Sequence, residues 1–381
     1  MIYFDHAAST PLHPLALKQY CESLATDFAN PSSAHRLGRS LNKRVEEVRH
    51  LFLETVAARE VDYDFIFTAS ATEANNTIVR WIVGGSEGKN DGRIYYSCGD
   101  HPSITESIAR WGGSNNGRCV EGGGKLDDLL DDLLDGLRAV FLIQVNNSSG
   151  VISDVEKIAS KIKNFCPDIY VHVDAAQSFC KIPLSLRKAE IDSVTISAQK
   201  CGGPKGVAGL YLKKKRVSTF SPLLVGGGQE HALRASTVNA PAIFAWGAAV
   251  SALGSVSELE QNYRYVTRLN DLLRAQLSAK VPVVQFPFYS CSPYILLIIA
   301  PKVASDILVR HLEEREIYVA SSAACSSRVK GENKTFSAMG IANSLHKHVL
   351  RLSFSPSNTE AEILEFVKNF ADIYHQLLEF T

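Results

Sequence analysis

The chain has 381 residues, of which 45% are hydrophobic, and its 40 basic residues balance its 40 acidic residues. A chain of this length and composition can bury a large core and is long enough for two domains. Because the charges cancel, nothing predicts binding to nucleic acid or to an anionic membrane, and a small molecule is the favoured partner.

No apolar run approaches the roughly 20 residues of a membrane-spanning helix. Residues 2–5 are strand-like and follow Met1 directly, which leaves no room for a signal or transit peptide. The eight cysteines include no CxxC pair and no metal-ligand spacing. We therefore expect a cytoplasmic protein without a metal site, whose cysteines are reduced thiols.

Strand-like and helix-like segments alternate along most of the chain, which is typical of an α/β fold. Short apolar runs predict buried strands at 65–67, 139–143, 171–173 and 193–197. The spacing of apolar residues predicts helices at 71–80, 126–137 and 155–165. The last of these helices is the expected crossover to the strand at 171–173.

The pattern changes beyond about residue 255. A long polar helix is followed by a predicted strand at 294–299, a helix at 304–315, a strand at 317–320 and a final helix from Glu360. We expect a large domain at residues 15–255 and a smaller α+β domain formed by residues 1–14 and 256–381.

Two chemically active residues follow neighbouring predicted strands. Asp174 closes the strand at 171–173, and Lys200 lies just beyond the strand at 193–197. Either residue alone is commonly a helix cap or a solvated surface group. At the carboxyl ends of strands, where α/β sheets bind ligands, the pair suits pyridoxal phosphate (PLP). The cofactor needs a lysine amine for its Schiff base and a carboxylate that keeps the pyridine nitrogen protonated.

The segment 68–73 can hold the phosphate of such a cofactor. It contains small and hydroxyl residues between the strand at 65–67 and the helix at 71–80, and a helix N-terminus favours an anion. The same residues can equally serve as a simple helix cap. Ser197 can add a second hydroxyl to the same anion.

A series of short motifs runs along nearly the whole chain. They are residues 3–11, residues 30–33 with His35 and Gly38, residues 70–73, His101, Asn146 with Asn147, residues 172–177, Lys200 with residues 203–206, residues 234–237, Cys325 and Arg351. In this order, the motifs resemble those of cysteine desulfurases of the NifS/IscS type, within the class V aminotransferases of PLP fold type I. The resemblance implies a large domain with a mixed, mostly parallel seven-stranded sheet and a smaller α+β C-terminal domain.

The resemblance also implies roles for individual residues around PLP. Lys200 would form the Schiff base, and Asp174, Gln177 and His101 would contact the pyridine nitrogen, the ring oxygen and the ring face. The implied phosphate ligands are Ala71, Thr72, Ser197, Gln199 and, from the second subunit of a homodimer, Thr237. Arg351 and Asn147 would bind the substrate carboxylate.

Cys325 separates a desulfurase from its relatives. A cysteine is most often a buried structural thiol, but Cys325 lies in the small, polar segment 321–328, which is typical of a mobile loop. The nearby Arg328 and Lys330 favour its thiolate. The implied catalytic residues are therefore Cys325, Lys200 and His101.

The implied reaction converts L-cysteine to L-alanine and leaves the sulfur as a persulfide on Cys325 for a sulfur-acceptor protein. The sulfur would serve iron–sulfur cluster, tRNA or thio-cofactor biosynthesis. Another class V enzyme, such as an aminotransferase or a selenocysteine lyase, would use Lys200 and Asp174 without needing Cys325. A non-catalytic scaffold subunit with the same fold would not need PLP at all.

The chain departs from the family pattern at several positions. Gln199 stands where a histidine is usual, although its amide can still donate a hydrogen bond to phosphate. Ser148, Ser236 and the pair Ser355 and Pro356 also replace the usual residues. These replacements remove no reactive group and indicate a divergent branch.

Overall fold

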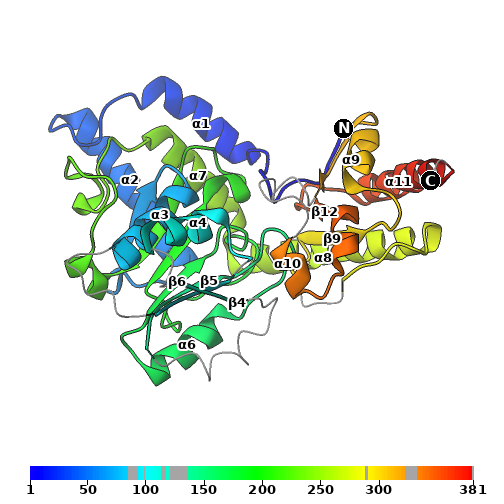
Figure 1. The fold of residues 1–381 in the computed structure, drawn as a ribbon. Helices are drawn as coiled ribbons and strands as arrows, with labels where there is room; N and C mark the ends of the chain where they lie inside the picture. The colour runs from blue at the N-terminus through cyan, green and yellow to red at the C-terminus, as the bar shows by residue number, and fades with distance from the viewer. Residues whose placement is uncertain are drawn as a thin grey trace.

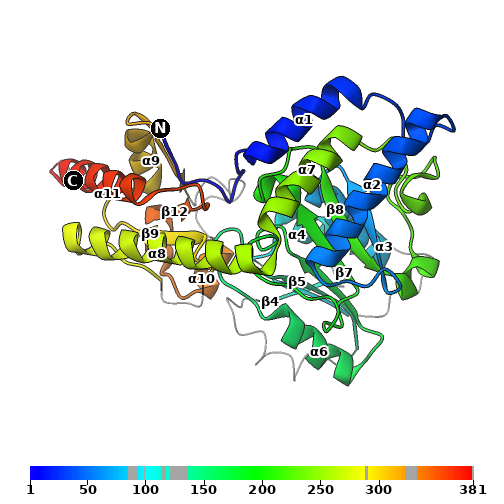
Figure 2. The same ribbon diagram turned by 180° about the vertical axis from the view of Figure 1, so that it is seen from behind.

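The computed structural model describes residues 1–84, 93–97, 99–112, 117–120, 136–287, 291–321 and 333–379. The chain forms a larger and a smaller lobe, and both termini lie on the smaller one (Figure 1, Figure 2). The elements up to the end of the larger lobe are β1 (Ile2–Tyr3), α1 (Pro14–Thr26), α2 (Arg36–Thr55), β2 (Tyr63–Thr68), α3 (Ala71–Gly84), β3 (Arg93–Ser97), α4 (Pro102–Gly112), β4 (Gly117–Val120), β5 (Leu137–Ile143), α6 (Val155–Phe165), β6 (Tyr170–Asp174), β7 (Ser193–Ser197), β8 (Ala208–Lys213) and α7 (Ala240–Leu253).

The larger lobe is built on a seven-stranded sheet with the strand order β2-β8-β7-β6-β5-β3-β4. All neighbouring strands from β4 to β7 are parallel, and β8 runs antiparallel to both β7 and β2. This arrangement confirms the predicted mixed, mostly parallel sheet. Every residue of β6 and β7 is buried, as expected for central strands covered by helices on both faces.

Helices cover the two faces of this sheet with separate apolar cores. On one face, the core includes Phe52 of α2, Ile158 of α6 and Trp246 of α7. On the other, Ile78 of α3 and Ile108 of α4 pack against the sheet. The carboxyl ends of β5, β6 and β7 therefore meet at one edge of a rigid, doubly covered sheet.

The smaller lobe contains β9 (Ile295–Ile299), β10 (Ile317–Tyr318), β11 (Ala320–Ser321) and β12 (Val349–Ser353), with helices α8 (Val256–Lys280), α9 (Ser305–Glu313), α10 (Lys334–Ala338) and α11 (Glu360–Leu378). Strands β11, β12 and β9 form an antiparallel sheet, and β1 pairs in parallel with β10. A third apolar core joins Phe4 of the N-terminal segment to residues of α8, α9 and α11. The predicted domain boundaries at residues 15 and 255 stay a prediction.

Several predicted elements match closely, since α6 and β7 have the predicted bounds. The single strand predicted at 317–320 is wrong. Residues 317–318 pair with β1, whereas residues 320–321 pair with β12, so the chain changes sheets at Val319. Most of the helix predicted at 126–137 lies outside the described residues, and Leu137 begins β5.

Within the described residues, no single helix is long and apolar enough to span a membrane. Helices α7 and α8 reach the required length and composition only as a pair, with a bend of 74° between them. The same residues contain no cluster of three or more His, Cys, Asp or Glu side chains that could hold a metal ion.

Candidate active site

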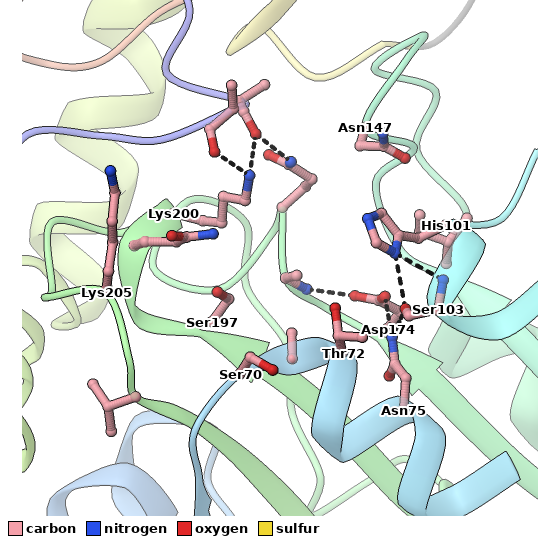
Figure 3. Close-up of a pocket in the computed structure, with 18 of the residues that line it drawn as sticks. Ser70, Thr72, Asn75, His101, Ser103, Asn147, Asp174, Ser197, Lys200 and Lys205 are labelled. Carbon is pink, nitrogen blue, oxygen red and sulfur yellow. Dashed lines mark hydrogen bonds between the residues drawn. The ribbon is translucent and has the colours of Figure 1, made fainter. Parts of the chain in front are cut away.

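A cavity of about 270 Å³ lies at the carboxyl ends of β5, β6 and β7 (Figure 3). Most of the predicted site residues line it, namely Ala71, Thr72, His101, Asn147, Asp174, Gln177, Ser197, Gln199, Lys200 and Arg351. These residues come from segments far apart in the sequence. The fold therefore brings together the groups that the sequence motifs singled out.

Lys200 ends a single turn of 3-10 helix, Ala198–Lys200, directly after β7. Its Nζ donates hydrogen bonds to the backbone oxygens of Ala7 and Ala8, each at 2.5 Å. The chain that follows is tightly packed, because a Cβ at Gly203 would lie 2.6 Å from the Trp246 ring. The lysine is thus held at the cavity by a segment with little room to shift.

Asp174 is the last residue of β6, and two hydrogen bonds fix its carboxylate. Oδ1 accepts the N–H of Ala176 at 2.9 Å, and Oδ2 accepts Nδ2 of Asn75 at 2.8 Å. His172 lies two residues earlier on the same face of the strand, with its Nε2 3.1 Å from Oδ1 of Asn75. Burial lowers the pKa of His172 to about 3, so the ring is neutral and donates this hydrogen bond from Nε2.

His101 is linked to the same amide through Ser103 (Figure 3). Nδ1 of His101 accepts the N–H of Ser103 at 3.1 Å and lies 2.8 Å from Ser103 Oγ, which in turn accepts Asn75 Nδ2 at 2.9 Å. Burial lowers the pKa of His101, so the ring is neutral with its proton on Nε2.

Hydroxyl groups and a helix N-terminus gather at the other end of the cavity. Ser70 Oγ accepts the N–H of Glu73 and so caps α3, which leaves the N–H groups of Ala71 and Thr72 for an anion. Ser70, Thr72 and Ser197 lie close together in this region (Figure 3). Lys205 also lines the cavity, but its side chain points away from these hydroxyl groups (Figure 3). This end has the properties of a phosphate site.

Gln177 has unused hydrogen-bonding capacity at the cavity. Its Nε2 donates to the backbone oxygen of Ala7 at 2.9 Å, but its buried Oε1 has no partner among the described residues. A buried polar atom without a partner is costly unless a ligand or water satisfies it. The amide is therefore placed to bind a polar group of a ligand in this cavity.

Arg351 of β12 reaches the cavity from the smaller lobe, and only 5% of its surface is exposed. Its guanidinium donates to Oδ1 of Asp5 at 2.8 Å and to the backbone oxygen of Asn147 at 2.9 Å. The Nε–H group has no partner in the described part of the chain. A buried guanidinium with a spare donor can bind a carboxylate.

One predicted site residue, Thr237, is exposed and does not line the cavity. The predicted catalytic Cys325 lies outside the described residues. Conversely, the motifs did not include Asn75 or Ser103, and they gave no role to Lys205 within the matching segment 203–206; all three residues line the cavity. Helical spacing could have indicated Asn75, because it lies one turn after Thr72 on α3.

The residues present fit PLP. A fixed carboxylate, a lysine amine, a neutral histidine and a phosphate site at a helix N-terminus are the groups that this cofactor needs. The arrangement combines them in one cavity with an arginine for a substrate carboxylate. A cavity of this kind can therefore support amino-acid chemistry.

Known proteins resemble this chain over nearly its whole length. The sequence profile of the family "Aminotransferase class-V" matches residues 2–366. A "NifS/IcsS protein homolog" of Lactobacillus delbrueckii subsp. bulgaricus is 31% identical over 98% of this chain and 97% of its own length. A cysteine desulfurase of Cereibacter sphaeroides is 31% identical over 99% of this chain and 96% of its own. Among solved structures, a NifS-like protein from Rickettsia africae has a TM-score of 0.86 and 28% identity, covering 98% and 99% of the two chains.

Proposed function

This chain belongs to the class V aminotransferase family, and on that basis we propose that it is a PLP-dependent cysteine desulfurase. The observation that carries the proposal is the single cavity shared by Lys200, Asp174 and Arg351. The substrate is L-cysteine, and the products are L-alanine and a sulfur atom bound to the enzyme.

The cofactor would be held from three sides. Asp174 would bind its pyridine nitrogen, Lys200 would bind it covalently, and His101 would cover one face of its ring. The N-terminus of α3, with Ser197 and Gln199, would hold the phosphate. When bound, PLP supplies an electron sink for the negative charge that forms at the substrate Cα.

The chain's own groups would bind and deprotonate the substrate. Arg351 would take the substrate carboxylate with its spare Nε–H, beside the side chain of Asn147. The Nζ of Lys200 would leave the backbone oxygens of Ala7 and Ala8 and accept the α-proton. Neutral His101 can hold a proton at Nε2 without adding charge to the site.

Sulfur transfer would use the Cys325 thiolate. Its Sγ forms a bond to the substrate sulfur while the substrate Cβ–S bond breaks, and Cβ takes up a proton. L-cysteine and an enzyme thiol thus give L-alanine and an enzyme persulfide, with no external oxidant or reductant. A sulfur-acceptor protein would then remove the outer sulfur.

The proposal includes a homodimer. Thr237 is exposed and outside the cavity of its own chain, which suits a residue that completes the phosphate site of a second copy. Sedimentation of the PLP-loaded protein is expected to give a dimer, and Thr237→Ala is expected to weaken PLP binding. A monomer with undiminished PLP affinity in Thr237→Ala would contradict this part.

Alanine release from L-cysteine tests the proposed function. The PLP-loaded protein is expected to release alanine, Lys200→Ala is expected to release none, and the exposed-lysine control Lys188→Ala is expected to match the parent. Borohydride reduction followed by peptide mass spectrometry should place the cofactor on Lys200. Covalent cofactor on Lys205 instead, or alanine release by Lys200→Ala at the parent rate, would overturn the proposal.

A further inference from the structure

A second cavity, of about 530 Å³, lies beside the candidate active site and shares Lys200 with it. Its walls come from residues 10–14, 180–181, 200–202 and 354–357 and from the junction of α7 and α8. Apart from Lys200, its side chains have no role in the proposed reaction. The wall includes the half-buried apolar side chains of Leu12 and Leu253 and the charged side chain of Lys181.

Lys181 carries a buried charge without a counter-ion. Only 8% of its surface is exposed, and in the described part of the chain its Nζ has neither a hydrogen bond nor a carboxylate partner. Nζ lies 5.7 Å from the centre of the Tyr294 ring. Burial lowers the pKa of Lys181 to about 8, so the side chain remains an ammonium at pH 7. An uncompensated buried charge is costly, and an anion beside it removes much of that cost.

The surroundings of Lys181 favour an anion with a single charge. The groups that act on it are Lys200 and the thiols of Cys180 and Cys201, and none of these is a carboxylate. Glu258 of α8 lines the same cavity but is exposed and makes no ion pair with Lys181. Lys200 also lines the cavity, but its Nζ donates to the backbone oxygens of Ala7 and Ala8. Lys181 is thus the ammonium that faces this cavity without a polar contact in the described part of the chain, and one such ammonium suits a short carboxylate better than a phosphate dianion.

We propose that this second cavity binds a small monocarboxylate, with its carboxylate on Nζ of Lys181 and its apolar part against Leu12 and Leu253. The ligand would lie next to Lys200, because that residue lines both cavities. Binding there would change the electric field at the proposed cofactor lysine. The inference does not depend on which reaction the active site performs.

Thermal unfolding of the PLP-loaded protein with propionate as the probe tests this site. The buffer at pH 7 contains a salt of a bulky sulfonate anion, and propionate is substituted for that anion stepwise. The ionic strength therefore stays constant while the propionate concentration rises. Since a ligand that binds the folded state stabilises it by mass action, the parent is expected to unfold at a higher temperature as propionate rises. Propylammonium, a cation of the same size, is expected to have no such effect.

Three variants separate the site from general salt effects. Lys181→Met keeps the shape of the side chain and removes its charge, so propionate is expected to bind at least about tenfold more weakly. Lys181→Arg and the exposed control Lys188→Met are expected to respond as the parent does. A parent without a propionate response, or an equal response in Lys181→Met, would overturn the proposal. The alanine assay of the active site is measured separately, so its failure is distinguishable from failure of this site.

Discussion

Asn75 connects three groups of the candidate site through one fully buried side-chain amide. Its Nδ2 donates to Asp174 and to Ser103, and its Oδ1 accepts from His172. Because the carboxylate of Asp174 can only accept, it fixes which end of the amide faces it. That orientation then places the proton of His172 on Nε2. A single residue thus orders the carboxylate that would bind the pyridine nitrogen.

Asn75→Leu is expected to weaken PLP binding by about tenfold or more, because it removes one of the hydrogen bonds of Asp174 and leaves Nε2 of His172 without its partner. Titration of the cofactor-free protein with PLP measures the change. Asn76→Ala is the control, since Asn76 donates to the backbone oxygens of Thr72 and Ser103 and accepts from Ser107, but does not contact Asp174. Equal PLP affinity in Asn75→Leu and the parent would show that the amide does not position Asp174.

The buried carboxyl group of Asp100 is expected to make the free energy of unfolding depend on pH. It is buried, its Oδ2 accepts the N–H of Ser97, and burial raises its pKa to about 8. The unfolded carboxyl titrates near pH 4, so between about pH 4 and 8 the folded state binds more protons than the unfolded state. The contribution of Asp100 to the free energy of unfolding is therefore lost as pH rises through this range.

Asp100→Asn removes this titration. We expect the free energy of unfolding of the variant to exceed that of the parent increasingly from pH 5 to 8, by on the order of 3 kcal/mol at the upper end. Urea unfolding at a series of pH values measures the difference. Asp168→Asn, at an exposed position, serves as the control. A difference that stays constant across this range would contradict the assignment.

At the residue scale, the sequence predicted groups that sit in motifs or at strand ends. Asp174 and Lys200 were predictable because the ends of the two strands that precede them can be recognised in the sequence. Arg351 was predictable because of the family resemblance. The role proposed for Lys181 was not predictable from the sequence. It depends on the burial of the ammonium without a counter-ion, and that burial results from the packing of the two lobes.

At the scale of elements, a buried ion pair ties α2 to the segment that carries Thr237. Arg49 of α2 donates two hydrogen bonds to Glu230, at 2.8 and 3.0 Å, and Glu230 also accepts the N–H of Phe67 at 2.7 Å. Residues 230–232 all have positive φ, a backbone conformation that costs free energy in residues other than glycine. The ion pair helps to hold this strained turn.

Arg49→Met is expected to lower the free energy of unfolding by about 3–5 kcal/mol, because it leaves the buried carboxylate of Glu230 without its cation. Adding Glu230→Gln is expected to restore part of the loss. Arg59→Met removes an exposed pair with Asp62 and is expected to cost less than about 1 kcal/mol. Urea unfolding distinguishes these values, and similar losses for Arg49→Met and Arg59→Met would contradict the role of the buried pair.

The limits of prediction for elements are visible at β10 and β11. The run 317–320 has the composition of one strand, and nothing local indicates that its halves join different sheets. Its partners, β1 and β12, are distant in sequence, so tertiary pairing decides the outcome. By contrast, α6 was predictable from its apolar spacing, because Asp154 caps it locally and one face packs on the sheet.

In the whole molecule, the first residues of the chain join the two lobes at the site. β1 pairs with β10 in the smaller lobe, Asp5 holds Arg351, and the backbone of Ala7 contacts both Lys200 and Gln177. The resemblance predicted the two-lobed architecture and the sheet. It did not predict that the N-terminal segment would supply these contacts, which depend on backbone groups rather than on recognisable side chains.

The proposed desulfurase reaction is tested most directly by measuring alanine and sulfide released from L-cysteine, with a thiol reductant present, by the PLP-loaded protein and by Cys325→Ala. Cys21→Ala, which alters an exposed cysteine, is the control. Equal amounts of both products are expected from the parent and from Cys21→Ala, and neither product is expected from Cys325→Ala. Alanine release by Cys325→Ala at the parent rate would contradict the proposed transfer of sulfur to Cys325.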